Sequence, residues 1–270
     1  MKKSKILSAV LTGVLSLGLI GCGGSSSSDD KTIKIGVSPV PHKEIIDVIK
    51  DDVEAKGYKL EVTEFDEYLI QDTAVEEGEL DANFFQHIAY LNQVNKEQGY
   101  DLAVAAKVHI EPMGVYSNTV KSIKDVKDGA KIAIPNDPSN EARALRLLQA
   151  AGLIEVPEGE TVTPVDITKN DKKLEFVEMD ASQLPRTLEE VDLAVINGNY
   201  ALDAGLNVNE DAIFVEDKNE ESIQDMVNIL AVKKENLDSE KTKVLVEALT
   251  SDKVKEFIEE KYNGAVIPVF

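Results

Sequence analysis

The sequence predicts an α/β fold with two lobes and a ligand cleft between them. From Thr32 onward, short β-rich runs alternate with helical patterns, which is typical of layers built from βαβ units. A second series of such elements begins after Ser117. The chain has 270 residues, of which 43% are hydrophobic, so it can build a core large enough to divide into two.

The elements of the first lobe follow one another in alternating order. A strand at 32–38 precedes a helix at 43–56, in which Ile45, Ile46 and Ile49 recur at helical spacing. The remaining expected elements are a strand at 59–65, a short helix at 71–78, a strand at 80–85, a helix at 87–98 ending at Gly99, and an extended stretch at 102–117.

The second lobe repeats the pattern and the chain then returns. We expect a strand at 131–136, a helix at 139–151 ending at Gly152, strands at 174–179 and 193–197, a returning strand at 228–234, and closing helices at 239–250 and 252–262. The chain therefore crosses twice, with lobe I at 31–117 plus 226–270 and lobe II at 118–225. Two crossings make a hinge, and a cleft beside a hinge is a common place for a small-molecule site.

The first 21 residues have the pattern of a secretory signal peptide. Three lysines precede an apolar run at 6–20 that is short for a transmembrane helix. The segment Leu19-Ile20-Gly21-Cys22 resembles the lipobox of bacterial lipoprotein precursors. That resemblance implies cleavage before Cys22 and acyl chains such as palmitate on the protein, which anchor it stably. The alternative is an uncleaved anchor helix with an incidental cysteine.

Residues 22–30 are rich in Gly, Ser and Asp and have nothing to bury, so we expect a lipidated flexible tether. The chain carries 29 Lys and Arg against 50 Asp and Glu, and the signal peptide removes three of the lysines. We therefore expect the domain to be held at the extracytoplasmic face of the bacterial membrane by lipid and not by charge.

Composition excludes several classes of function. A formal charge of −21 without a basic cluster argues against nucleic-acid binding. One cysteine can form neither an internal disulfide nor a Cys-rich metal site. No nucleophile motif, phosphate loop or dinucleotide-binding motif follows a strand, so we expect neither an enzyme nor a cofactor. Three histidines, His42, His87 and His109, leave metal binding open as an alternative, although we expect no metal and a structural role for His109.

One strand-to-helix junction favours an anion. In 135–143, Asp137 or Ser139 can cap the helix, Pro138 suits its first turn, and free N–H groups would then face beyond the strand. Arg143 follows, and a guanidinium can bind a carboxylate through two parallel hydrogen bonds. The alternative is a capped helix with a solvated arginine.

Two further strand ends carry amides and aromatic residues. The run 80–90 places Phe84 and Phe85 before a helix, and 193–200 contains Asn197 and Asn199. Strand ends facing a cleft are where ligands bind in open α/β sheets. Alternatively the asparagines only turn the chain and the phenylalanines belong to the core.

At these segments the chain resembles the NlpA-type lipoproteins, methionine-binding components of bacterial ABC importers. The matching motifs are Gly36-Val-Ser-Pro-Val-Pro-His42, Gly78-Glu-Leu-Asp-Ala-Asn-Phe-Phe-Gln-His87, Ile134-Pro-Asn-Asp-Pro-Ser-Asn140, Arg143-Ala-Leu-Arg-Leu-Leu-Gln149, Gln183-Leu-Pro-Arg186, Ala194-Val-Ile-Asn-Gly-Asn-Tyr-Ala201 and Gly264-Ala-Val-Ile-Pro268. The resemblance implies a type II periplasmic-binding-protein fold. Gln71-Asp72-Thr73 departs from the family pattern, in which a Pro-Asn pair is common after the tyrosine.

The resemblance also implies a ligand site. Arg143 would bind the carboxylate of an amino acid with Asn140 beside it, while Asn197 and Asn228 would hold the amino and carboxyl groups. The wall of the side-chain pocket would be Tyr68, Phe85, His87 and Tyr90. Such an aromatic box suits a thioether, because sulfur near a ring edge contributes about 0.3–1.5 kcal/mol per contact.

These observations together predict a lipid-anchored receptor, a monomer, that binds L-methionine, or also D-methionine, and delivers it to a membrane permease driven by an ATPase. One alternative is the same fold binding a methionyl dipeptide or another amino acid. The others are a metal-binding receptor and a lipoprotein that acts as a surface interaction partner.

Overall fold

The computed structural model describes residues 31–159, 161–218 and 221–270. The expected signal peptide, the lipidation site at Cys22 and the tether lie outside the described residues. Within the described ranges, no helix combines the length and the apolar character needed to cross a lipid bilayer.

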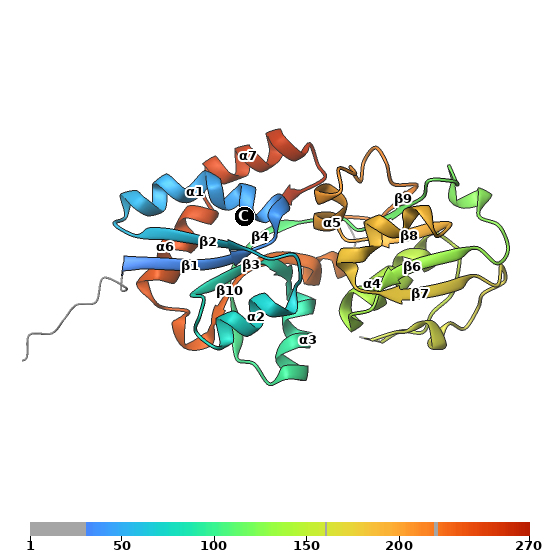
Figure 1. Ribbon diagram of the computed structural model, residues 1–270, viewed down its shortest axis with the longest axis horizontal. Coiled ribbons are helices and arrows are strands. Elements are labelled where there is room, and N and C mark those ends of the chain that lie inside the picture. Colours follow the sequence, from blue (N-terminus) through green and yellow to red (C-terminus); the bar gives the residue numbers. More distant parts are fainter. Residues whose placement is uncertain (1–30, 160, 219–220) are drawn as a thin grey trace, which may run out of the picture. The chain divides into compact units, whose positions relative to one another are not determined.

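Residues 31–270 form a compact unit built around two sheets (Figure 1). The six-stranded sheet has the order β11-β4-β10-β3-β1-β2, and the five-stranded sheet has the order β7-β6-β8-β5-β9. The strands are β1 Thr32–Val37, β2 Lys59–Glu64, β3 Ala82–His87, β4 Leu102–Ile110, β5 Gly114–Tyr116, β6 Lys131–Pro135, β7 Glu175–Met179, β8 Leu193–Ile196, β9 Phe214–Val215, β10 Val227–Lys233 and β11 Ile267–Pro268.

The helices alternate with these strands. They are α1 Glu44–Ala55, α2 Leu69–Glu76, α3 Ile88–Gln98, α4 Pro138–Ala150, α5 Gly198–Asp203, α6 Glu240–Leu249 and α7 Asp252–Tyr262. Short 3₁₀ segments occur at Ile123–Asp125, Pro164–Asp166, Ala181–Glu189, Glu221–Met226 and Lys234–Asn236, and a π-type segment at Pro39–Lys43. The predicted two-lobed α/β architecture is confirmed.

Strand β10 shows why the six-stranded sheet is covered on both faces. Its side chains alternate: Leu230 and Val232 join the core that includes α1, α6 and α7, whereas Ile229 and Ala231 join the cluster under α2 and α3. A strand buried on both faces reads as a continuous apolar run, as 229–232 does.

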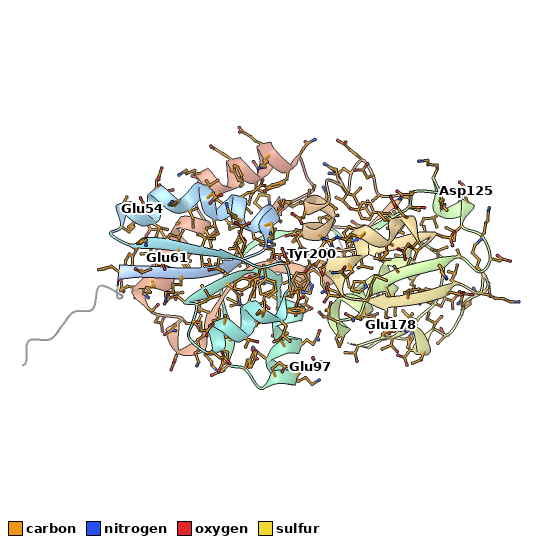
Figure 2. All side chains as sticks on the ribbon, viewed as in Figure 1. Glu54, Glu61, Glu97, Asp125, Glu178 and Tyr200 are labelled. Atoms are coloured by element: carbon orange, nitrogen blue, oxygen red, sulfur yellow. The ribbon has the colours of Figure 1, made fainter. Side chains whose placement is uncertain are left out.

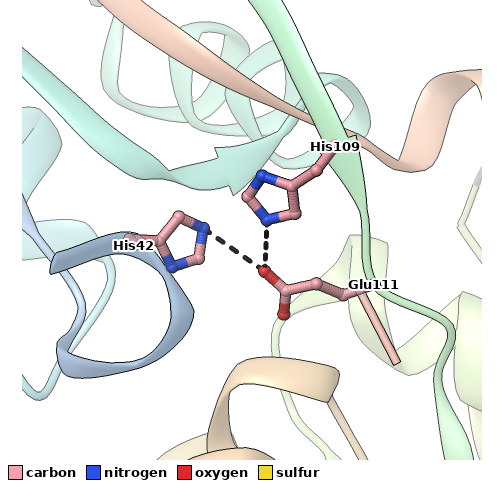
Figure 3. Close-up of side chains that lie close together, drawn as sticks. All are labelled: His42, His109 and Glu111. Atoms are coloured by element: carbon pink, nitrogen blue, oxygen red, sulfur yellow. Dashed lines mark hydrogen bonds and ion pairs between the residues drawn. The ribbon is translucent and has the colours of Figure 1, made fainter. Parts of the chain in front are cut away.

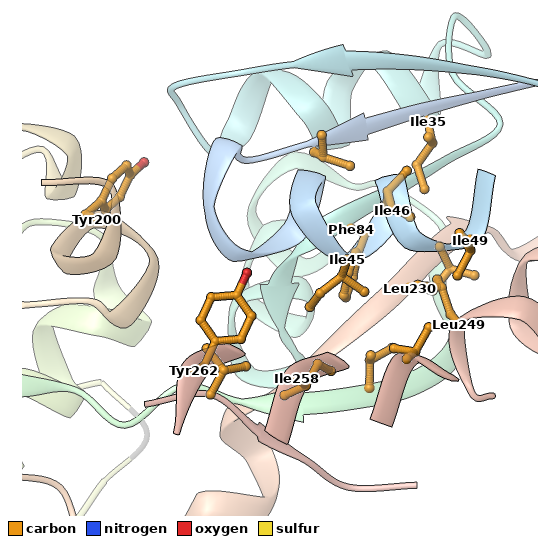
Figure 4. Close-up of a cluster of buried hydrophobic side chains, with 14 of the residues drawn as sticks. Ile35, Ile45, Ile46, Ile49, Phe84, Tyr200, Leu230, Leu249, Ile258 and Tyr262 are labelled. Atoms are coloured by element: carbon orange, nitrogen blue, oxygen red, sulfur yellow. The ribbon is translucent and has the colours of Figure 1, made fainter. Parts of the chain in front are cut away.

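The larger core lies where α1 packs against α6 and α7 (Figure 4). Ile45, Ile46 and Ile49 of α1 are fully buried there, with Phe84 of β3. Phe84 is thus a core residue, as one reading of its segment expected, whereas Phe85 belongs to a separate small cluster with Tyr90. Strand alternation separates these two neighbours onto opposite faces of the sheet.

The second core lies between the five-stranded sheet and α4. Ile132 and Ile134 of β6 and Leu145 and Leu148 of α4 are fully buried. Figure 2 shows the contrast with the surface, where acidic side chains such as Glu54, Glu97 and Asp125 project outward.

Some element boundaries differ from the prediction. The stretch at 102–117 is two strands, because β5 pairs with β8 and β9 in the five-stranded sheet. The first passage between sheets is therefore at 111–113, before the expected boundary after Ser117. Helix α2 begins at Leu69, two residues earlier than predicted, and β3 continues to His87. The short strands β9 and β11 lack a long apolar pattern and were not predicted.

Candidate functional site

All eight residues expected to bind the ligand line one cavity of about 20 Å³. Four further residues complete the lining: Gln86, Glu111, Gly198 and Asn199. Sheet topology explains the convergence. Strands β6 and β8 are parallel neighbours, so their carboxyl ends, where α4 and α5 begin, lie at the same edge. The lining also includes Phe85 and His87 from the end of β3.

The position of Asn228 follows from strand register. Asn228 is the second residue of β10 and pairs with His87 on β3 and with His109 on β4. It is therefore held between two histidine-bearing strands, and its side chain is 5% exposed.

The cavity has room for about one water molecule. An amino acid can enter only if the walls move, because the lining side chains are bonded to one another. These bonds are the ones that a ligand would exchange or reorganise.

Three aromatic rings form one wall of the cavity. Tyr68, at the start of α2, lies 5.3 Å from Phe85 and 5.4 Å from Tyr90, measured between ring centroids. Tyr200 stacks on Tyr68 at 5.0 Å, at 29° between ring planes. Burial raises the pKa of Tyr68 well above its ordinary value, so the hydroxyl stays protonated and can donate. The unusual Gln71-Asp72 sequence that follows does not turn Tyr68 away from the cavity.

His87 links α3 to α4 and has a defined tautomer. Its Nδ1 accepts the backbone N–H of Tyr90 at 3.1 Å, so the ring proton lies on Nε2, which donates to Oδ1 of Asn140 at 3.0 Å. Burial lowers the pKa of His87 to about 4, so the ring is neutral at pH 7. Asn197 donates its Nδ2–H to the same Asn140 oxygen at 2.7 Å.

The start of α4 corrects one expectation. Asp137, one of the two predicted candidates, is the cap and accepts from the backbone N–H of Asn140 at 3.0 Å. The N–H of Ser139 donates to Gln93 Oε1, and the N–H of Glu141 donates to the Asp137 carbonyl. These helix N–H groups were expected to face an anion, but they already have acceptors. Any carboxylate ligand must therefore be bound by side chains.

Arg143 is buried, with its guanidinium bonded on one edge. Its Nε donates to Glu216 Oε1 at 2.8 Å, and its Nη2 donates to Glu216 Oε2 at 2.5 Å and to the Glu111 carbonyl at 2.9 Å. Burial would raise the pKa of Glu216, but Arg143 outweighs this and the pKa is lowered. The alternative of a solvated arginine is wrong, since the side chain is 5% exposed.

His42, His109 and Glu111 form a buried triad beside the cavity (Figure 3). Glu111 Oε1 lies 2.7 Å from Nε2 of His109 and 3.3 Å from Nε2 of His42. His42 Nε2 is also 3.2 Å from Oδ1 of Asn228. Burial lowers the pKa of His42 to about 4 and of His109 to about 3, while burial raises that of Glu111. With neutral rings, His109 donates its Nε2–H to Glu111, and His42 donates its Nε2–H to Oδ1 of Asn228 while Glu111 lies 3.3 Å away.

The donor chemistry of this triad favours hydrogen bonding over a metal ion. A metal on both Nε2 atoms would move each ring proton to Nδ1, and metal-bound histidines normally donate that proton to a second partner. Both Nδ1 atoms are buried without a partner in the part of the chain that the structure describes. The three histidines considered as an alternative metal set do not form one group, because His87 bonds Asn140 instead.

A second polar cluster lies under α2. Asp72 is fully buried and accepts from Asn83 Nδ2 at 2.7 Å and from Gln86 Nε2 at 2.5 Å. Burial raises its pKa from 3.8 to about 7, although both hydrogen bonds act in the opposite direction. Gln86 connects this cluster to the cavity, whose wall it joins.

Sequence reasoning missed Glu111, Gly198, Gln86 and Glu216 as parts of the site. His109 and Glu111 stand two apart in an extended segment, which places them on one face, so this pair could have been found. Glu216 had no local pattern, because it meets Arg143 across 73 positions of sequence.

Comparison with known proteins agrees with this geometry. A family model described as NlpA lipoprotein matches residues 33–270. A Bacillus subtilis protein named methionine-binding lipoprotein MetQ is 41% identical over 266 residues, covering 96% of this chain and 95% of that protein. A nutrient-binding protein from Burkholderia cenocepacia, solved bound to methionine, has a TM-score of 0.84 and 43% identity over 88% of this chain and all of that chain.

A third relative is described as a periplasmic substrate-binding protein of an ABC transporter, from Coxiella burnetii. Its structure has a TM-score of 0.83 and 38% identity, covering 88% of this chain and all of that chain. The predicted periplasmic-binding-protein fold and the predicted non-enzymatic class are thereby confirmed. The chain belongs to the NlpA lipoprotein family.

Proposed function

We propose that this chain is a lipid-anchored, extracytoplasmic substrate-binding protein that binds methionine for import by an ABC transporter. One observation carries the ligand class: a buried arginine, a set of amides and a wall of three aromatic rings line the same cavity. An α-amino acid with an apolar, unbranched side chain has the matching chemistry at each end.

In this proposal, Arg143 binds the carboxylate, assisted by Asn140 and Asn197, and Asn228 binds the polar end from β10. The thioether lies against Tyr68, Phe85 and Tyr90, where each sulfur–ring contact contributes about 0.3–1.5 kcal/mol. His87 and Asn197 both donate to the Asn140 oxygen and hold its side chain in place, so a ligand must compete with these hydrogen bonds.

Closure of the two lobes on the ligand is part of the same proposal. The cavity is lined by Phe85 and Asn228 from the six-stranded sheet and by side chains at the starts of α4 and α5, beside the five-stranded sheet. A ligand that contacts both groups binds the closed state better than the open one, and that difference is what shifts the population. The predicted lobes were 31–117 plus 226–270 and 118–225; because β5 pairs with β8 and β9, we now assign 31–113 plus 226–270 to the first lobe and 114–225 to the second.

The relatives support the transport role. One is named for methionine binding, one was solved bound to methionine, and one is described as a component of an ABC transporter. The partners would be the permease and its ATPase, with Cys22 carrying the lipid anchor and the protein acting as a monomer. No metal or cofactor takes part.

Calorimetric titration of the full chain, purified in mild detergent, tests the proposal. L-methionine, D-methionine, alanine, leucine and methionyl dipeptides are the ligands. We expect saturable methionine binding. Methionine should also raise the free energy of unfolding by RT ln(1 + [L]/Kd), and the melting temperature should rise with it. Tight binding of a dipeptide or leucine in preference to methionine would replace the ligand, and no response to any of them would refute the receptor role. Mass spectrometry of the purified chain, which would detect acyl chains attached at Cys22, tests the lipid anchor separately.

A further inference from the structure

We propose that Glu216 is a positioning and specificity residue: it holds the guanidinium of Arg143 and balances its charge, so that the cavity selects ligands carrying their own ammonium group over simple carboxylates. This inference rests on the proposed function, because it concerns how the same cavity distinguishes amino acids from the corresponding acids.

The contact between these two residues is bidentate and largely shielded from water. Two parallel N–H···O bonds of 2.8 and 2.5 Å join the Nε and Nη2 edge of Arg143 to the carboxylate of Glu216. The side chains are 5% and 15% exposed, so water screens the pair weakly. Such fork geometry restricts the guanidinium plane to one orientation.

Glu216 is itself fixed from a second direction. Its Oε2 accepts the backbone N–H of Met113 at 3.1 Å. Met113 lies in the first passage between the sheets, whereas Glu216 follows β9 in the second. Arg143 Nη2 also donates to the carbonyl of Glu111 in the first passage. The arginine is thus tied to both connections between the sheets.

One edge of the arginine stays available. Among the described residues, the hydrogen bonds of Arg143 use Nε and Nη2 and none uses Nη1. Because Arg143 lines the cavity, Nη1 is the edge left to bind a ligand carboxylate. Glu216 therefore sets both which edge is presented and in which plane.

The charges around the cavity then explain selectivity. Among the described residues that line the cavity, Arg143 is the one cationic side chain, and three carboxyl groups lie close to it or to Asn140: Glu216, Glu111 and Asp137. Glu111 accepts the Nε2–H of His109 and a backbone N–H from Asn199, as a carboxylate does, while burial raises its pKa. With Arg143 compensated by Glu216, a ligand of net charge −1 meets a surplus of negative charge. A zwitterion brings an ammonium to offset it.

The test compares methionine with its α-hydroxy analogue, 2-hydroxy-4-(methylthio)butanoate, which has a hydroxyl where methionine has the ammonium. Calorimetry on the full chain in detergent would give the ratio of the two dissociation constants for the wild type, Glu216→Gln and Glu216→Asp. The matched control is Glu175→Gln, which removes one negative charge from an exposed side chain of β7, at a position far from Arg143 in the sequence.

We expect the wild type and the Glu175→Gln control to prefer methionine strongly. In Glu216→Gln the ratio of the two dissociation constants should fall by at least about tenfold, because the charge of Arg143, no longer neutralised by Glu216, favours the anionic analogue. Glu216→Asp keeps the charge but shortens the side chain, so the two hydrogen bonds to Arg143 are disturbed. The methionine affinity of this variant should fall, while its preference for methionine over the hydroxy analogue should persist.

Equal losses for both ligands in Glu216→Gln would show a purely structural role and overturn the inference. So would an unchanged ratio with unchanged affinities, or an aspartate variant that matches the wild type in affinity. If Glu216→Gln does not fold, the aspartate variant still decides the positioning role. Failure of the wild type to bind methionine would instead refute the proposed function itself.

Discussion

Tyr68 donates its hydroxyl proton to Oδ1 of Asn199 at 2.6 Å, and this bond joins the start of α2 to the start of α5. A reciprocal bond runs from the Tyr200 hydroxyl to the carbonyl of Asp66 at 2.8 Å. The two tyrosine rings stack on each other between these bonds. Tyr68 also lines the cavity. The same side chain therefore joins these two segments and forms part of the wall of the proposed pocket.

Removing only the hydroxyl of Tyr68 should remove the hydrogen bond to Asn199 and leave the aromatic ring in the cavity lining. We expect Tyr68→Phe to reduce methionine affinity by about 1 kcal/mol, the usual contribution of one hydrogen bond. Titration calorimetry measures this, with Tyr100→Phe as control, since its hydroxyl bonds Thr73 away from the cavity lining. An affinity that falls equally in the control would point to a general loss of packing.

Truncating the aromatic wall should change selectivity. We expect Tyr68→Ala and Phe85→Ala to weaken methionine binding more than alanine binding, because only methionine reaches the rings. The measurement is the ratio of the two dissociation constants. If both ligands lose affinity equally, these residues do not form the side-chain pocket.

Arg143→Ala should lower both affinity and stability. The ligand carboxylate would lose its cation, which costs about 2–5 kcal/mol of binding. Glu216, whose side chain is 15% exposed, would lose its partner, and breaking such a largely buried pair costs up to about 3–5 kcal/mol of unfolding free energy. Calorimetry and urea unfolding separate the two effects. Arg146→Ala, three residues along α4 and bonded to the carbonyl of Gly159, should leave methionine affinity unchanged.

Gly198 is required by close packing. A Cβ built there would lie 2.6 Å from Cβ of Glu111 and 3.0 Å from its Oε2. We expect Gly198→Ala to displace Glu111 and to reduce the unfolding free energy by about 1–3 kcal/mol, as overpacking does. Chemical unfolding measures the loss, and a variant as stable as the wild type would show that Glu111 can move freely.

Asp72 should make stability depend on pH. Its pKa is about 7 in the fold against 3.8 ordinarily, so between these values the folded state retains a proton that the unfolded state has lost. The unfolding free energy should therefore fall as pH rises through this window, by at most about 1.4 kcal/mol per pH unit, and level off above pH 7. Asp72→Asn should remove that slope.

Unfolding curves at several pH values test this pH dependence, and the control is Asp51→Asn, which changes an exposed aspartate of α1. The difference between wild type and variant is the relevant quantity, because Glu141, whose pKa burial raises to about 8, adds a slope of the same sign to both proteins. Parallel curves for wild type and Asp72→Asn would contradict the assignment.

The triad should act in the opposite sense and without metal. His42 has a pKa of about 4 in the fold against 6.5 ordinarily, so below pH 6.5 the unfolded state binds the extra proton and stability falls as pH drops toward 4. His42→Gln should reduce this acid loss. Chelator treatment should leave the melting temperature and methionine affinity unchanged, and stoichiometric zinc in the untreated protein would refute the hydrogen-bonded triad.

Local patterns in the sequence determined most elements and much of the candidate site. The apolar spacing of Ile45, Ile46 and Ile49 predicted α1, and the run 137–139 placed the start of α4 at 139, one residue after its observed start at Pro138. Motifs that resemble one family also indicated eight ligand-binding residues, and the structure brings all eight to one cavity. Their contacts with a ligand remain predictions. These features depend on neighbours in the chain, so the sequence alone carries them.

Tertiary structure alone decided which partners those residues meet. Glu216 reaches Arg143 across 73 positions, and Tyr68 reaches Asn199 across 131. No periodicity records such pairs, since their contact arises only when separate strands and helices pack. The same packing assigned β5 to the second sheet, and it buried Asp72 and the three histidines. Burial sets their pKa values, because the cost of desolvating a charge depends on everything that surrounds it in space.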